Sequence, residues 1–271
     1  MKNLFKAFLF KTRHDLAFKI TLLIGVGLAL LLSLLYWGIG EMAGGKIISG
    51  QMMLYASLSP VQNFGIAIPV NLITYTVLEF SQGSIRNKVI GGHSKSKIYT
   101  SLFLNGLVFT FILIGVYASL CFGLGCAFGG FSPNGTAGIL AGETADYFLG
   151  KIILIAIFSY ISIVSFTIFF AALFRNIGPS IPVIIVGLTI AYLAGTFISL
   201  LGEMNPNIVW VARIIDPLYG LGCTEMKYVD ETTSYQVITN ETLVSSIISN
   251  SVYAALFFSG GLFIFKKRDI K

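Results

Sequence analysis

Six long runs of apolar residues, separated by polar connections, dominate the chain. A bilayer core of about 30 Å is crossed by about 20 residues of helix. The runs are continuously apolar and do not alternate as half-buried strands would. They predict an all-α fold with six membrane-spanning helices, at residues 19–37, 61–80, 99–128, 148–174, 177–201 and 247–265.

The composition agrees with a lipid environment. Apolar and aromatic residues make up 55% of the 271 residues, and charged residues only 11%, against about 25% in soluble domains. The net charge of +6 could suggest a nucleic-acid partner. The basic residues, however, gather at the ends of the apolar runs, as in membrane proteins. We therefore expect one transmembrane domain over residues 1–271, in contact with lipid and with no nucleic acid.

The basic residues also predict the orientation. Of the 18 Lys and Arg residues, 14 lie in the N-terminal segment, in the connections after the second and fourth runs, and in the C-terminal tail. The other connections hold four. Because cytoplasmic segments carry the excess of Lys and Arg, both termini are expected in the cytoplasm.

The first 15 residues form an amphipathic pattern. At 100° per residue, one stripe collects Leu4, Phe5, Phe8, Leu9 and Leu16. Lys2, Lys6 and Arg13 lie opposite. This pattern predicts an interfacial helix on the inner leaflet; the alternative is a frayed basic tail.

The connection at residues 202–246 is the longest. Its part from Asn207 to Gly222 is too apolar for a solvated loop, and Pro217 makes it a poor span. We expect a re-entrant hairpin there, since irregular backbone at membrane depth must be covered by protein; a loop packed on the outer surface is the alternative. The polar residues 224–240 are expected outside.

Catalytic patterns are absent from the sequence. It contains neither G-x-x-x-x-G-K-[ST] nor H-E-x-x-H, the patterns of a P-loop ATPase and a zinc protease. His14 and His93 lie outside the apolar runs. We therefore expect no catalytic residue and no metal site in this chain.

Few charged or amide side chains lie inside the predicted spans. Asn63, Asn71 and Asn105 are candidates for a substrate path, and Glu79 is the only acid, at the edge of its span. An ion-coupled carrier would normally bury acids near the midplane.

The inner connection after Glu79 carries the clearest local pattern. Gln82 and Gly83 should end the preceding helix, and Ser84 should cap a new one. Ile85, Val89 and Ile90 form an apolar stripe, and Gly91-Gly92 should end the helix. The pattern predicts a two-turn helix over Ser84–Ile90. Such a short helix needs a partner surface, either another protein or the lipid headgroups.

This stretch, Glu-x-x-x-Gly-Ser-Ile-Arg-Asn-Lys followed by Ser-Lys-Ser-Lys-Ile-Tyr and another apolar run, resembles the first cytoplasmic loop of type-2 ATP-binding-cassette (ABC) exporter permeases. Those loops often have Thr where this chain has Ser84. The layout of the whole chain is also similar to that family, although only about twenty residues carry the motif.

The resemblance implies a bacterial cell-membrane permease that is not itself an enzyme. Two permease chains, identical or paralogous, would pair with two ABC ATPase subunits, and ATP and Mg²⁺ would bind to those partners. Matched to the family motif, the ATPase-coupling residues would be Glu79, at the inner end of the second span, and, within loop 81–98, Gly83, Ser84, Ile85, Arg86, Asn87, Lys88 and Val89. Arg175 would add a minor contact, and the Ile85/Val89 stripe would seat in the ATPase.

The aromatic-rich spans suggest an apolar or amphipathic cargo, such as a hydrophobic peptide, an antibiotic or a lipid-like compound. Two alternatives remain open. One is a secondary carrier or channel that needs no ATPase, and the other is a non-transporting immunity or sensor protein. Co-purification with a P-loop ATPase separates the exporter from both.

Overall fold

The computed structural model describes residues 6–7, 10, 12–42, 50–58, 67–130, 145–204, 225–230, 233–237 and 240–268. From Leu16 onward, this described part contains eight helices and one two-stranded ribbon. They are α2 (Leu16–Met42), α3 (Gly50–Leu58), α4 (Ala67–Ser81), α5 (Ser84–Ile90), α6 (Lys95–Gly129), α7 (Ala145–Phe174), α8 (Ile177–Met204), β1 (Glu225–Asp230), β2 (Thr233–Val237) and α10 (Asn240–Lys267).

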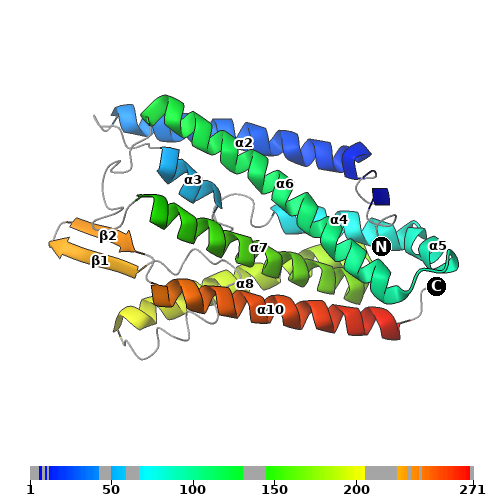
Figure 1. Cartoon of the computed structure of the whole chain (residues 1–271). Coiled ribbons are helices and arrows are strands. Elements are labelled where there is room, and N and C mark those ends of the chain that lie inside the picture. Colours follow the sequence, from blue (N-terminus) through cyan, green and yellow to red (C-terminus); the bar gives the residue numbers. More distant parts are fainter. Residues whose placement is uncertain are drawn as a thin grey trace.

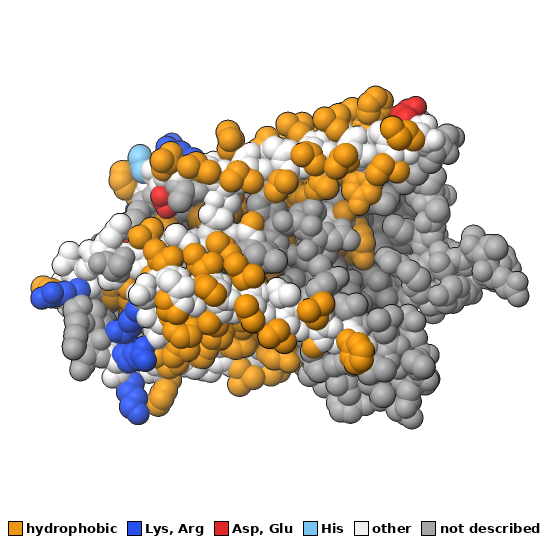
Figure 2. All heavy atoms as spheres, turned by 180° about the vertical axis from the view of Figure 1, so that it is seen from behind, with side chains coloured by type: hydrophobic (Ala, Val, Ile, Leu, Met, Phe, Trp, Pro, Cys, Tyr) orange, Lys and Arg blue, Asp and Glu red, His pale blue; other side chains and the backbone are white. Residues whose placement is uncertain are grey.

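The long helices lie side by side and run back and forth along one axis (Figure 1). These apolar runs are expected to form helices, because lipid offers no hydrogen-bond partner and a helix satisfies its backbone N–H and C=O groups internally. The start of α2 and the end of α10 lie at the same end of the bundle, together with α5. Lys and Arg side chains gather at this end (Figure 2), which we call the basic end.

Among the described residues, four helices are long and apolar enough to cross a membrane: Phe18–Ile39, Lys95–Gly129, Gly150–Phe174 and Leu243–Lys267. In the other two predicted spans, the described residues form shorter apolar helices, at Ala67–Phe80 and Ile177–Ala191. The chain is therefore membrane-embedded by length and composition, while the count of six spans stays a prediction.

Helix α7 lies at the centre of the bundle. In α7, 67% of an apolar 18-residue stretch is buried, against 22% of the corresponding stretch of α2 and 11% of that of α10. The main core cluster includes Phe109 from α6 and Tyr160 from α7. The outer sides of α2, α8 and α10 remain apolar, as expected for surfaces that face lipid.

Glycines allow the closest helix contacts. A Cβ atom added at Gly125 of α6 would lie 2.8 Å from Met53 of α3, and one added at Gly187 of α8 would lie 3.2 Å from Phe166. A Cβ atom at Gly261 of α10 would lie 2.0 Å from the hydroxyl of Tyr99. In these places, small residues serve packing within one chain.

Several sequence predictions fall partly or wholly outside the described residues. The proposed re-entrant stretch, residues 207–222, is one of them. In the N-terminal segment, residues 6, 7, 10 and 12–14 are helical, but four of the five stripe residues are not described. Thr12, which falls within the angular range of the predicted stripe, is 5% exposed and donates a hydrogen bond to the Tyr75 hydroxyl, whereas Phe10, on the opposite side of the helix, is 68% exposed.

Helix α3 and the β1–β2 ribbon were not predicted. The ribbon is antiparallel, with Glu225 opposite Val237. It lies at the end of the bundle opposite the basic end (Figure 1), in the stretch expected as a polar outer loop. The fold is thus built mainly, but not wholly, of helices.

Candidate functional site

The junction between α4 and α5 is a tight turn. The amide of Gln82 donates to the carbonyl of Leu78 (3.0 Å), and α4 ends one residue earlier, at Ser81. Gly83 takes the left-handed conformation, with φ 67° and ψ 7°. Glycine adopts this conformation without strain. The prediction that Gly83 helps to end the preceding helix is therefore confirmed.

A buried carboxylate ties α5 to α4. Glu79 is 0% exposed. One of its oxygens accepts a hydrogen bond from the Ser84 hydroxyl (2.8 Å) and lies 2.5 Å from the Lys88 ammonium group. These contacts hold the first and last turns of α5 against the end of α4, and the expected pairing of Glu79 with a nearby cation is present.

Ser84 does not cap α5, contrary to the sequence prediction. The N-cap position is Gly83, and no side chain makes a capping hydrogen bond. The Ser84 hydroxyl instead donates to Glu79. A charged acceptor makes a stronger hydrogen bond than a neutral one, which explains why the Ser84 hydroxyl bonds to the Glu79 carboxylate and does not cap the helix.

Two of the three residues of the predicted apolar stripe of α5, Ile85 and Val89, point inward, and the third, Ile90, does not. Ile85 is 1% exposed and belongs to the main core cluster, and Val89 packs against that cluster. The expectation that Ile85 seats in a partner is therefore wrong for this conformation. The opposite face of α5 presents Arg86, Asn87 and Ile90, all exposed; Ile90 is 73% exposed. We call these three residues the outward face.

Helix α5 ends as predicted, and α6 follows directly. The amides of Gly91 and Gly92 donate to the carbonyls of Asn87 (2.9 Å) and Val89 (3.0 Å), and Gly92 has a φ of 81°. The first residue of α6, Lys95, lies three residues beyond Gly92. Movement of α5 would thus reach α6 through a very short link.

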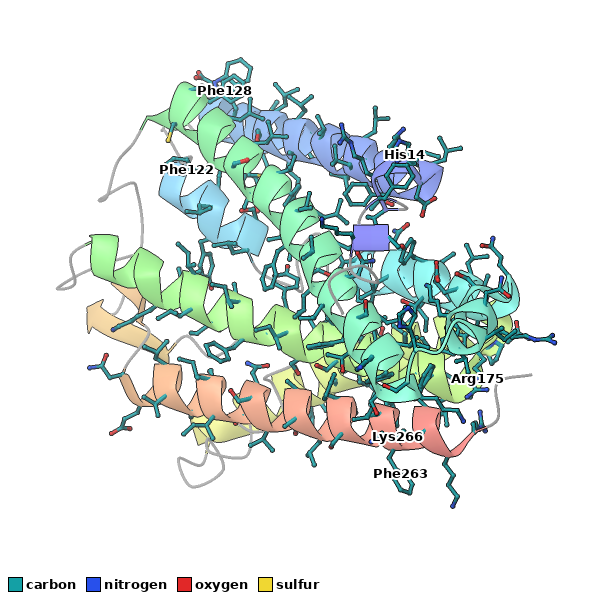
Figure 3. All side chains as sticks on the ribbon, turned by 45° about the vertical axis from the view of Figure 1, so that its right-hand side comes forward. His14, Phe122, Phe128, Arg175, Phe263 and Lys266 are labelled. Atoms are coloured by element: carbon teal, nitrogen blue, oxygen red, sulfur yellow. The ribbon has the colours of Figure 1, made fainter. Side chains whose placement is uncertain are left out.

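Arg175 lies in the two-residue turn between α7 and α8, next to this site. Its backbone is left-handed (φ 54°). Its guanidinium group lies over the ring of Phe80, 5.6 Å from the centroid, within the favourable range for a cation–π contact. Since Phe80 follows Glu79 in the chain, the structure brings Arg175 to the α4–α5 junction (Figure 3).

Two basic residues that the sequence reasoning missed connect the end of α10 to this region. The Lys95 ammonium group donates to the carbonyls of Lys266 (3.1 Å) and Arg268 (3.0 Å). The Arg268 guanidinium group donates to the carbonyl of Leu173. Cations at a helix C-terminus satisfy its last carbonyls and offset its dipole. No local signal predicts pairs separated by 171 residues.

The asparagines expected along a substrate path have structural partners. Asn105 is 1% exposed, and its amide group donates to the hydroxyl of Thr12 (3.3 Å). Asn71 accepts a hydrogen bond from Thr21 (2.7 Å). Both therefore fasten the N-terminal part of the chain to α4 and α6, and their place in a path stays a prediction. Asn63 lies outside the described residues.

The comparisons give no relative from which a function could be transferred. No family model, no curated protein and no solved structure matches this chain.

Proposed function

We propose that this chain is the permease subunit of an ABC exporter in a bacterial cell membrane, and that α5 couples it to a separate ATPase. The observation that carries the proposal is α5 itself. The stretch that resembles the family loop forms a separate short helix at the basic end of an apolar bundle. The four helices in the described part of the chain that are long enough to cross a membrane support the membrane role.

The coupling would work by transmitting a displacement of α5 to α4 and α6. A partner that pushed on the outward face would press on a helix whose inner side, Ile85, is embedded in the core. The Glu79–Lys88 pair would pass the displacement to α4, and the short link to Lys95 would pass it to α6. A loosely attached helix would absorb the push by local unfolding, so this firm attachment suits a coupling element.

The outward face has the composition of a modest docking surface. Burying an exposed isoleucine such as Ile90 contributes about 1.5–3 kcal/mol before ordering costs. An exposed ion pair of Arg86 with a partner carboxylate contributes about 0–1 kcal/mol. Ile90 should therefore matter more for association than Arg86.

Co-purification tests this proposal. The chain, extracted in mild detergent from its native membrane, should bring with it a protein that carries a P-loop. Ile90→Asp should lower the amount of that ATPase per permease at least tenfold, since a carboxylate would have to enter the contact. Gln82→Asp is the matched control, because it adds the same charge at an exposed position beside α5 but off the outward face.

Two results would contradict the proposal: recovery of the wild-type chain without any P-loop protein, or full retention of the ATPase by Ile90→Asp. Ile85→Asp would not help, because a carboxylate in the core destabilises the permease itself.

The expected assembly contains two permease chains and two ATPase chains, with ATP and Mg²⁺ on the ATPases and an apolar or amphipathic cargo. The absence of a P-loop pattern from the sequence supports this division of labour. The purified chain alone should hydrolyse no ATP, and turnover by this polypeptide without a partner would overturn the assignment.

A further inference from the structure

A cavity of about 190 Å³ lies among α2, α3 and α6, in the half of the bundle away from the basic end. Helix α3 approaches α6 closely at Gly50, where an added Cβ atom would overlap the sulfur of Cys126. The cavity begins further along α3, at Met53, Ala56 and Ser57. The cavity therefore lies between the helices, next to the close contact at Gly50.

The lining combines rings, thioether and hydroxyl groups. Tyr36 of α2 and Tyr117 of α6 contribute aromatic rings, and Met53 contributes a sulfur atom that is suited to contact with an aromatic ligand. Ser57 is 3% exposed. Its hydroxyl donates to the carbonyl of Leu54 (2.7 Å), so its oxygen lone pairs remain as acceptors. No charged residue is among the lining residues that the structure describes.

The walls of the cavity formed by α2 and α3 are partly exposed. Leu32, Tyr36 and Ala56, which line it, are partly exposed, while Tyr117 and Cys121 at its inner wall are 2% and 1% exposed. A ligand dissolved in the membrane could therefore enter between α2 and α3.

We propose that this cavity binds a small neutral ring that carries a hydroxyl group, a phenol-like group. The volume suits one ring, since an engineered apolar cavity of about 150 Å³ binds benzene. The rings and Met53 favour an aromatic body, and the Ser57 oxygen accepts the ligand hydroxyl. Since the described lining residues carry no charge, a neutral ligand is favoured over an ion. This site does not depend on any ATPase partner.

Equilibrium binding of radiolabelled phenol to the full chain in lipid nanodiscs tests the proposal. Wild-type protein should show a saturable component of one phenol per chain above the partitioning into lipid. Ala56→Leu and Cys121→Leu, which fill the cavity from α3 and from α6, should each abolish it. Ser57→Ala should weaken it about fivefold, the loss expected for one hydrogen bond. Gly115→Ala is the matched control, because an added Cβ atom there meets nothing within 4 Å.

Competition identifies the chemistry and the source of the ligand. Benzene should compete more weakly than unlabelled phenol, and benzoate should not compete. If 4-octylphenol also competes, the ring can belong to a larger amphiphile that enters from the bilayer; if it does not, the ligand is a small free compound. The absence of a saturable component, or its survival in both filled variants, would overturn the proposal.

Discussion

Replacing Lys88 with Met should loosen α5 more than replacing Glu79 with Gln, although the two residues form one ion pair. The reason is the unequal burial of the partners: the Lys88 side chain is 18% exposed, and that of Glu79 is 0% exposed. Lys88→Met leaves a carboxylate in the interior without the ammonium group at 2.5 Å. Glu79→Gln leaves a cation that can still reach water.

The magnitudes follow from this difference. Breaking a buried pair by removing one partner costs about 3–5 kcal/mol, and we expect Lys88→Met near the lower end because Ser84 still donates to Glu79. Glu79→Gln keeps an acceptor for Ser84 and should cost about 1–2 kcal/mol, the difference between a charged and a neutral hydrogen bond. Three kcal/mol corresponds to a roughly hundredfold increase in local opening.

Hydrogen–deuterium exchange of the peptide covering residues 82–93, in nanodiscs, measures this opening. Lys88→Met should speed exchange in α5 by roughly a hundredfold and Glu79→Gln by about tenfold, since about 1.4 kcal/mol is a factor of ten. Lys97→Met, at an exposed lysine, should leave exchange unchanged. If α5 exchanged at the wild-type rate in Lys88→Met, or faster in Glu79→Gln than in Lys88→Met, the pair would not be what holds α5 in place.

Three further perturbations have defined outcomes. Gly261→Ala should lower the thermal unfolding midpoint in detergent, because the new methyl group would overlap the Tyr99 hydroxyl at a cost of about 1–3 kcal/mol. Gly115→Ala is the control and should leave the midpoint unchanged, so equal midpoints for the two variants would refute the close contact. Thr12→Val should cost about 1–3 kcal/mol by leaving Asn105 and Tyr75 without its hydroxyl, and chemical unfolding of the purified chain, with the exposed Ser119→Ala as control, measures the loss. In a cysteine-free background, Ser94→Cys should react with an impermeant maleimide only after the cells are opened, and Ser234→Cys in intact cells; the reverse pattern would invert the topology.

The start and end of α5 were predictable because their signals are local. Glycine at positions 83 and 92 takes the left-handed conformation in both turns, and no residue further along the chain competes for that role. The end of α7 at Phe174 and the start of α8 at Ile177 also match the ends of the apolar runs, whereas α10 begins at Asn240, seven residues before its run.

The direction in which α5 faces was not predictable from its sequence. Its stripe could cover headgroups, a partner or the chain's own core, and the choice depends on the apolar surface formed below it. That surface comes from distant segments: Phe80 and Phe265 pack with ring centroids 5.8 Å apart, and Tyr99 and Phe265 5.6 Å apart. Ser84 was misassigned for a related reason, since the carboxylate of Glu79, five residues earlier, attracts its hydroxyl.

The β1–β2 ribbon had a signal that could have been used. Tyr228, Val229 and Tyr235 belong to the residue types enriched in strands, and residues 225–230 and 233–237 are separated by only two residues, the spacing of a hairpin. By contrast, the contacts of Lys95 with the end of α10 had no such signal.

The most direct test of the proposed function is photo-cross-linking from α5 in living cells. A photoreactive phenylalanine analogue at position 90, on the outward face, should cross-link to a protein whose peptides include a P-loop. The same analogue in place of the exposed Gln82 should give far less of that product. Mass spectrometry would identify the partner. A P-loop ATPase captured at position 90 and not at position 82 is the result we predict. The absence of any such ATPase at position 90, in cells where the variant is inserted and stable, would contradict the exporter assignment.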